Sequence, residues 1–269
     1  MPELPEIETI RRDLFRDLKG KRIKDVEIIN AKVIKQPSAQ EFKRRLKGAT
    51  FKDFFRRGKV LACSLSSREY LTAHLRMSGQ LVYSSKKEPK ARVIFALANG
   101  KYLNFNDQRL FAELRLIKDW LKLKFVRGLG PEPLEKEFTL AKFSKMLSGK
   151  KSKIKPLLMD QSFIAGIGNL YSQEALFLAG IKPQRAANKL RKNEIKKLYQ
   201  VLQKLLRQAI QLKGSSIDNY LNGRGQTGKY HLRLKVYGRK GKQCFNCGRK
   251  IKKVNLGGRG TCFCPYCQH

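Results

Sequence analysis

The chain has 269 residues, enough for two domains with cores of their own, and it carries 59 lysines and arginines against 21 aspartates and glutamates. The resulting formal net charge of +38 favours a nucleic acid partner over a lipid surface, because basic side chains displace counterions from a phosphate backbone. No apolar run approaches the ~18 residues of a membrane-spanning helix, and the acidic start is unlike a signal peptide, so we expect cytoplasmic localisation and no membrane contact.

The first nine residues, MPELPEIET, contain the most reactive arrangement of groups in the sequence. Removal of Met1 exposes the secondary amine of Pro2, and an α-amino group, whose ordinary pKa is about 7.7–8, keeps a substantial neutral and nucleophilic fraction near neutral pH. Such an amine attacks a sugar aldehyde carbon to give an iminium ion, and Glu3 and Glu6 lie within one helical turn to handle protons. The same residues also fit an ordinary helix start with Pro5 in its first turn, and taken alone they favour this simpler interpretation.

Residues 5–18 are predicted to form an amphipathic helix, because their apolar residues recur at three- and four-residue spacing. Residues 22–125 follow with short β-branched and aromatic segments between glycine turns, a pattern typical of a β-sandwich. The clearest strand segments are 59–65, 69–75, 80–83, 92–98 and 101–105. The sequence GLGPEP at 128–133 is rigid and turn-rich, and it indicates a domain boundary.

Helices are expected to dominate after this boundary. The strongest helical pattern spans 189–213, where leucines and an alanine form one stripe that stops at Gly214. Residues 214–229 are rich in Gly, Ser and Asn and predict a mobile loop. We therefore expect an α+β protein with three domains, namely a β domain at 1–130, a helical domain at 131–228 and a cysteine-rich module at 229–269.

Two CxxC pairs near the C-terminus give the strongest metal signal in the sequence. Their members are Cys244, Cys247, Cys264 and Cys267. Two such knuckles, separated by 16 residues, can present four thiolates to Zn²⁺ tetrahedrally, and a full set of protein ligands makes the site structural rather than catalytic. A pair of disulfides is the alternative, which a reducing compartment disfavours. Between the knuckles, residues 257–261 predict a hairpin tip with Arg259 exposed toward phosphate or a DNA groove.

Four further motifs fit either a functional turn or an ordinary surface turn. They are RRGK at 56–59, HLRMSG at 74–79, DQRLF at 107–111 and GIGN at 166–169. The last precedes an apolar helix, where free N–H groups and an Asn169 cap can bind phosphate, and several lysines lie just before it. A plain capped turn explains that string equally well.

Taken together, these motifs resemble the bacterial formamidopyrimidine-DNA glycosylase family, also called 8-oxoguanine DNA glycosylase/AP lyase, and the match runs nearly end to end. It also covers IKPLLMDQ at 154–161, AGIGNLYSQEALF at 165–177 and VYGRKG at 236–241. The endonuclease VIII-like branch typically opens PEGPE, so Leu4 points to the formamidopyrimidine branch. The resemblance implies an N-terminal β-sandwich that carries the first helix, and a C-terminal helix–two-turn–helix domain with a zinc ribbon.

The resemblance also implies a base-excision repair enzyme that removes oxidised purines from damaged double-stranded DNA, and we expect it to be a monomer. DNA would lie between the two domains, with the damaged base flipped out of the stack. Pro2 would attack C1′ of the nucleoside and displace the base, Glu3 would protonate the opening sugar ring, and Glu6 would order the site. The iminium intermediate would then allow β- and δ-elimination, which cut the strand on both sides of the lost sugar.

DNA contacts are implied by the resemblance for further residues. Lys59 matches the site lysine that contacts a phosphate beside the lesion. Phosphate contacts are also implied for Asn169, Arg259, Tyr237 and Lys155. A wedge that fills the vacated stack and offsets the cost of unstacking is implied for Met77, Arg109 and Phe111. His74, in the same turn as Met77, is assigned to DNA binding as well.

Two departures from the family pattern concern the wedge and a nearby strand. Leu110 stands where family members usually carry a basic residue, and residues 90–93 read KARV in place of a His-Asp-His run. Both leave the preference for the opposite base open. Two other functions also stay open, namely an endonuclease VIII-like glycosylase for oxidised pyrimidines and a non-catalytic, zinc-dependent nucleic-acid-binding protein that would leave the PELPE motif idle.

Overall fold

The computed structural model describes all residues from 1 to 269, and they divide into two compact units. The first unit comprises Met1–Arg127 and Ile210–His231, and the second comprises Gly128–Ala209 and Leu232–His269. None of the helices combines the length and the apolar character that crossing a membrane requires.

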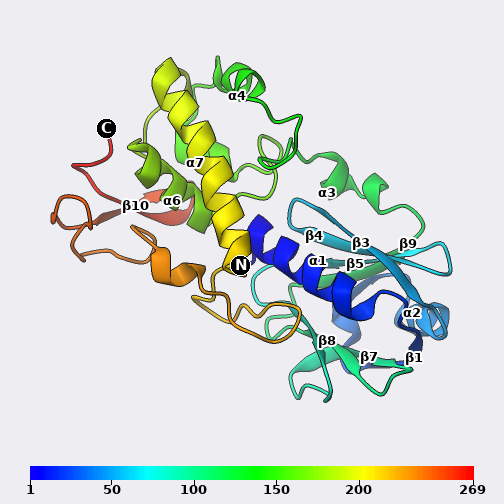
Figure 1. The fold of residues 1–269 in the computed structure, drawn as a ribbon. Helices are drawn as coiled ribbons and strands as arrows, with labels where there is room; N and C mark the ends of the chain where they lie inside the picture. Colours follow the sequence, from blue (N-terminus) through cyan, green and yellow to red (C-terminus); the bar gives the residue numbers. More distant parts are fainter. The chain divides into compact units, whose positions relative to one another are not determined.

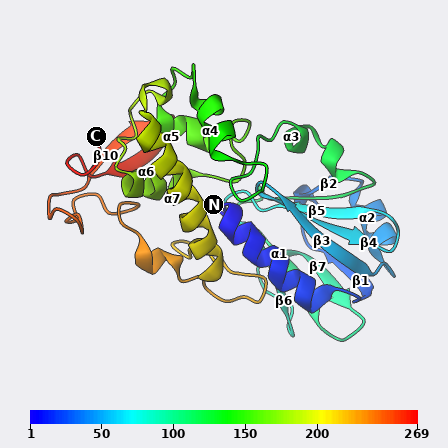
Figure 2. The same cartoon turned by 45° about the horizontal axis from the view of Figure 1, so that its top comes forward.

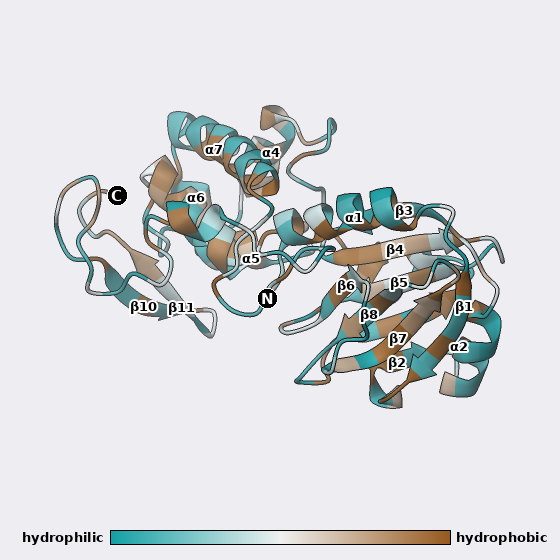
Figure 3. Cartoon of the chain, turned by 60° about the horizontal axis from the view of Figure 1, so that its bottom comes forward, coloured by the Kyte–Doolittle hydropathy of each residue, from teal (hydrophilic) through white to brown (hydrophobic).

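The first unit is a β-sandwich with one long helix (Figure 1). Its sheets have the strand orders β1–β7–β8–β6 and β2–β9–β5–β4–β3, and apolar side chains from both sheets form one core. The strands are β1 (Ile23–Ile28), β2 (Ile34–Gln36), β3 (Phe51–Arg57), β4 (Val60–Leu65), β5 (Tyr70–His74), β6 (Gln80–Ser84), β7 (Ala91–Leu97), β8 (Tyr102–Asn106) and β9 (Glu113–Ile117). Strand β4 is hydrophobic along most of its length (Figure 3), as a strand buried on both faces must be. The predicted β-sandwich is confirmed.

Helix α1 (Leu4–Leu18) covers the helix that the sequence predicted, and it lies along strand β3 (Figure 2). Its apolar stripe, from Ile7 to Leu18, is buried in the sandwich core. Helix α2 (Ala39–Leu46) was not predicted, because it is short and buries only Phe42 and Leu46. The last helix of this segment is the single turn α3 (Lys124–Arg127).

Glu8 fastens helix α1 to strand β3. Its carboxylate accepts hydrogen bonds from Arg11, Arg12 and Arg56 at 2.7 to 3.1 Å. Burial acts to raise the pKa of Glu8, but the neighbouring guanidinium groups outweigh burial and lower this pKa from 4.5 to about 2. Since Arg56 lies near the end of β3, this interaction fixes the strand that leads to Lys59 against the helix that begins beside Pro2.

The second unit consists of helices and a two-stranded ribbon. The helices are α4 (Leu140–Leu147), α5 (Ile154–Met159), α6 (Asn169–Ala179) and α7 (Lys192–Gln211), whose last two residues are grouped with the first unit. Helix α7 confirms the long helix predicted from the leucine stripe. Strands β10 (Lys252–Leu256) and β11 (Arg259–Phe263) form the expected hairpin, and Gly257 and Gly258 both have the positive φ that a two-residue turn between twisted strands requires.

Residues 214–229, predicted as a loop, contain no helix or strand and belong to the first unit. The backbone N–H of Ser215 donates to Glu6 at 2.9 Å. Near the other end, the guanidinium of Arg224 donates to both carboxylate oxygens of Asp17 at 2.6 and 2.7 Å. Both ends of the loop are therefore tied to helix α1.

We predict that Glu8→Gln lowers the free energy of unfolding by about 2 kcal/mol near pH 7, because three guanidinium groups lose a charged acceptor. The folded-state pKa of Glu8 lies below its ordinary value, so this stabilisation is present above pH 4.5 and is lost as the pH falls toward 2. Urea unfolding of both proteins across this range measures the difference.

Glu27→Gln is the matched control, because Glu27 and its partner Lys87 are both half exposed. Ion pairs at this exposure contribute little to the free energy of unfolding. A Glu8→Gln protein as stable as the wild type at neutral pH would show that Glu8 does not fasten the helix.

Candidate active site

The N-terminus of helix α1 brings two of the predicted catalytic carboxyls together. Glu3 is the N-cap residue, and its backbone N–H donates to Glu6 at 2.9 Å. The other carboxylate oxygen of Glu6 accepts the N–H of Ser215. Both glutamates are only 3% exposed, and a Cβ on Gly214 would lie 2.9 Å from Glu6 Oε1, so only glycine fits there without a shift. Glu6 therefore orients the segment that carries Pro2 and Glu3.

Lys59 is the cation of this group. It follows the β3–β4 turn at Gly58 and is 8% exposed. Burial lowers the pKa of Lys59, and the negative charges of Glu3 and Glu6 oppose this shift. The structure thus places a buried lysine within electrostatic reach of two buried carboxyls, and one of these, Glu3, directly follows the buried Pro2 in the chain.

Met77, Arg109 and Phe111 meet in the structure, although they come from two separate loops. Arg109 Nη1 lies 3.4 Å from Met77 Sδ, and Arg109 Cζ lies 4.9 Å from the centre of the Phe111 ring. Met77 and Phe111 are 43% and 51% exposed. Leu110 has a φ of +57°, and its side chain packs against the sandwich core instead. The loop therefore holds Leu110 inward while the Phe111 ring faces solvent.

Asp107 holds this loop in place, and the sequence reasoning did not identify it. The residue is fully buried, and its carboxylate accepts hydrogen bonds from Ser78 Oγ at 2.6 Å, Arg109 N at 3.2 Å and Ala112 N at 2.7 Å. The backbone carbonyl of Asp107 accepts a hydrogen bond from Arg92 Nε. Arg92 belongs to residues 90–93, where the sequence departs from the family pattern, so this departure helps to hold the loop that carries Arg109. An aspartate at the start of a turn is the local signal that indicates such a role.

His74 lies at the end of β5 in a largely buried environment. Burial and the charge of Arg76 lower the pKa of His74 to about 4, so the ring is neutral near pH 7. Its Nδ1 accepts the N–H of Arg76 at 3.3 Å, and the ring packs edge-on against Phe125. The His74 side chain is therefore held by contacts within its own unit.

Lys155 and Asn169 form one polar pair in the second unit. Lys155 is fully buried, and its Nζ donates to Asn169 Oδ1 at 2.6 Å. The expectation that Asn169 caps the helix is wrong, because Gly168 is the N-cap of α6 and Asn169 is its first residue. The Asn169 side chain instead bonds Lys155 and Gln173.

Two side chains of α6 that the sequence reasoning missed fix the neighbouring segments. Gln173 Oε1 accepts the N–H of Cys262, which joins the helix to the β10–β11 hairpin. Glu174 is fully buried and accepts the backbone N–H groups of Tyr237 and the two residues before it, at 2.8 to 2.9 Å. The hairpin and the Tyr237 segment are thus anchored to the same helix. The sequence did offer a signal for these two residues, because Gln173 and Glu174 are consecutive polar residues inside an otherwise apolar helix.

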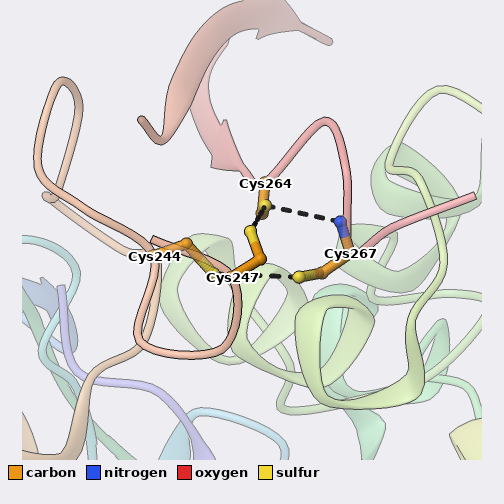
Figure 4. A group of neighbouring side chains, drawn as sticks. All are labelled: Cys244, Cys247, Cys264 and Cys267. Carbon is orange, nitrogen blue, oxygen red and sulfur yellow. Dashed lines mark hydrogen bonds between the residues drawn. The ribbon is translucent and has the colours of Figure 1, made fainter. Parts of the chain in front are cut away.

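The four predicted zinc ligands converge on one point (Figure 4). Their Sγ atoms all lie within 4.8 Å of one another, with 3.9 Å between Cys244 and Cys267 and 3.5 Å between Cys247 and Cys264. Four sulfurs at the usual Zn–S distance of ~2.3 Å are ~3.8 Å apart in a tetrahedron, and no disulfide joins these cysteines. The donor set fits one structural zinc ion.

Comparisons with known proteins agree with this arrangement. The family model for the formamidopyrimidine-DNA glycosylase N-terminal domain matches residues 1–114, the H2TH domain model of the same enzymes matches 129–220, and a zinc finger found in FPG and IleRS matches 241–269. The formamidopyrimidine-DNA glycosylase of Pelotomaculum thermopropionicum is 45% identical over 100% of this chain and 99% of its own. The chain belongs to the formamidopyrimidine-DNA glycosylase family. The family that the sequence motifs indicated is therefore confirmed.

Two solved structures of the Lactococcus lactis Fpg protein are similar over 99% of both chains. One is a complex with DNA that contains an abasic site, with a TM-score of 0.91 and 36% identity. The other is a complex with DNA that contains Fapy-dG, with a TM-score of 0.90 and 35% identity. The observed α+β architecture is thus the one that this family adopts.

We predict that Asp107→Asn slows excision of 8-oxoguanine from duplex DNA about tenfold, because loss of the charged acceptor loosens the loop that carries Arg109 and Phe111. Cleavage of a duplex that already contains an abasic site should change less than about twofold, since no base has to be moved. Single-turnover assays on the two duplexes measure both rates.

Asp53→Asn is the control, because Asp53 lies on the surface of the same unit and is 53% exposed. Equal losses on the two duplexes would mean that Asp107 supports the whole unit rather than this loop.

Proposed function

We propose that this chain is a bifunctional DNA glycosylase that removes oxidised purines, namely 8-oxoguanine and formamidopyrimidines, and then cuts the abasic strand. The observation that carries this proposal is the buried, electrostatically coupled group of Glu3, Glu6 and Lys59, with Glu3 directly after Pro2, in a member of this family. Endonuclease VIII-like activity on oxidised pyrimidines is less well supported, because the curated relatives carry the formamidopyrimidine name.

Pro2 is the proposed nucleophile once Met1 has been removed. Its nitrogen bonds to C1′ of the damaged nucleotide as the bond from C1′ to the base breaks. Glu3 gives a proton to the sugar ring oxygen, so that the ring opens and C1′ and the Pro2 nitrogen form an iminium ion. The Glu6 carboxylate, which accepts the N–H of Glu3, holds both groups in the orientation that the attack needs.

Strand cleavage follows from the same iminium ion. The iminium withdraws electrons from C2′, so loss of a C2′ proton expels the 3′ phosphate in β-elimination. A second, δ-elimination expels the 5′ phosphate and leaves a gap, and hydrolysis then releases Pro2 from the sugar fragment. The buried Lys59 ammonium stabilises the phosphate beside the lesion in this proposal.

Both units contribute proposed DNA contacts. Phosphate contacts are assigned to Lys59, Asn169, Arg259 and Tyr237, with the charge of Lys155 acting through Asn169. The wedge is assigned to Met77, Arg109 and Phe111, and a further contact to His74. The exposed hairpin position of Arg259 and the net charge of +38 support these assignments.

The three parts of the chain have separate tasks in this proposal. Residues 1–130 carry the chemistry and the wedge, while residues 131–228 and 229–269 supply further phosphate contacts. We propose that one copy suffices, since every assigned group comes from a single chain, and that the protein works on DNA in the bacterial cytoplasm.

A substrate competition tests the proposed function. The wild-type protein should excise 8-oxoguanine from duplex DNA at least about tenfold faster than thymine glycol and leave phosphates at both ends of the gap. Glu3→Gln should lose excision of 8-oxoguanine but keep measurable cleavage at abasic sites, because an abasic sugar is already partly open. A preference for thymine glycol would favour the endonuclease VIII-like alternative, and DNA binding without any cleavage would favour a non-catalytic protein.

A further inference from the structure

Both zinc knuckles carry an exposed aromatic ring that the core does not use. Phe245 lies between the first two ligands and is 64% exposed, and Tyr266 lies between the last two and is 53% exposed. Large apolar rings at such exposure contribute little to the packing of a small module. Since Cys244 and Cys267 are neighbours in the metal cluster, the two knuckles also lie side by side.

Each of these rings is paired with a guanidinium group. Arg239 Cζ lies 3.6 Å from the centre of the Phe245 ring, with Lys235 Nζ at 4.9 Å. Arg249 Cζ lies 3.7 Å from the centre of the Tyr266 ring. At these distances the planar groups are in van der Waals contact, so each knuckle presents a flat cation–π pair at the surface.

The surrounding module is uniformly cationic. Residues 232–269 include ten lysines and arginines and not one aspartate or glutamate. They are Arg233, Lys235, Arg239, Lys240, Lys242, Arg249, Lys250, Lys252, Lys253 and Arg259. Lys240, Lys242 and Lys250 are exposed and close in sequence to the knuckles. The charge around the rings therefore complements a phosphate backbone.

We propose that the two knuckles form a second nucleic-acid site, which binds a single strand by stacking unpaired bases on the Phe245 and Tyr266 pairs while the lysines contact its phosphates. A base in a duplex already stacks on its neighbours, and only an unpaired base can lie flat on a protein ring. Exposed rings in a field of lysines thus favour a single strand over a duplex.

This site is separate from the hairpin tip that carries Arg259. Strand β11 runs from Arg259 to Phe263, directly before Cys264. At about 3.3 Å per residue, the tip lies roughly 16 Å from the knuckle along an extended strand. The proposed single-strand site is therefore distinct from the hairpin contact assigned to Arg259.

Fluorescence anisotropy of the zinc-loaded, full-length protein tests the proposal. The probes are a labelled thymidine strand of about 12 nucleotides, the corresponding uridine strand, and an undamaged duplex of the same length. The combined Phe245→Leu and Tyr266→Leu variant keeps apolar bulk and charge but loses both ring faces. It should bind the single strands at least about tenfold more weakly, with the duplex affinity and excision of 8-oxoguanine unchanged.

Phe55→Leu is the matched control, because Phe55 is an exposed ring (41%) in the first unit and should leave single-strand binding unchanged. Unchanged binding of the single strands by the leucine variant would overturn the proposal, and so would an equal loss for single strand and duplex. A weaker effect on the uridine strand would restrict the site to DNA. If the leucine variant loses zinc, Arg249→Lys decides, because it keeps the charge, removes the planar group over Tyr266 and leaves the backbone hydrogen bonds of Arg239 in place. It should weaken single-strand binding alone.

Discussion

The carboxylate of Glu6 is the interaction on which the candidate active site depends. One of its oxygens accepts the N–H of Glu3, and the other accepts the N–H of Ser215, which is 209 residues away in the sequence. A chain terminus is ordinarily the least ordered part of a protein. Here one buried side chain fixes both the segment that carries Pro2 and the loop that returns to it. Reaction of a terminal amine at a sugar carbon needs such order, since misplacement by about 1 Å costs rate steeply.

Buried carboxylates hold two other proposed functional segments in the same way. Asp107 accepts two backbone N–H groups and a hydroxyl, and it sets the loop that carries Arg109 and Phe111. Glu174 accepts three backbone N–H groups, and it sets the segment that contains Tyr237. A buried carboxylate whose hydrogen bonds are satisfied makes a loop rigid, because breaking the network would leave a charge unpaired in the interior. The chain is rich in cations on its surface and keeps several of its few acids for this task.

Local patterns predicted much of this fold from the sequence. The helix at α1, the leucine stripe of α7, the alternating strands and the spaced cysteines are all set by neighbours within a few residues. Positions fixed by distant partners could not be found in this way. Asn169 was expected to cap a helix, but Lys155, 14 residues earlier in the chain, binds its side chain instead. The return of residues 210–231 to the first unit also depends on partners in α1, which no local pattern shows.

Among the candidate site residues, those of the proposed wedge show best which contacts the sequence could not predict. The motif placed Met77 and Phe111 in separate turns, and only the structure shows that Arg109 contacts both. The inward position of Leu110 follows from its left-handed backbone, which the sequence does not indicate for a leucine. Leu110, one departure from the family pattern, thus packs against the sandwich core. Arg92, which belongs to the other departure, donates to the backbone of Asp107 and so supports the same loop.

The most direct test of the central claim, that the ordered N-terminal amine carries the chemistry, is borohydride trapping on duplex DNA with an abasic site, followed by peptide mapping. Reduction of the iminium ion should join the DNA to the nitrogen of Pro2, and protein that retains Met1 should give no adduct. An adduct on Lys59 or another lysine, or equal trapping by protein that retains Met1, would contradict the account.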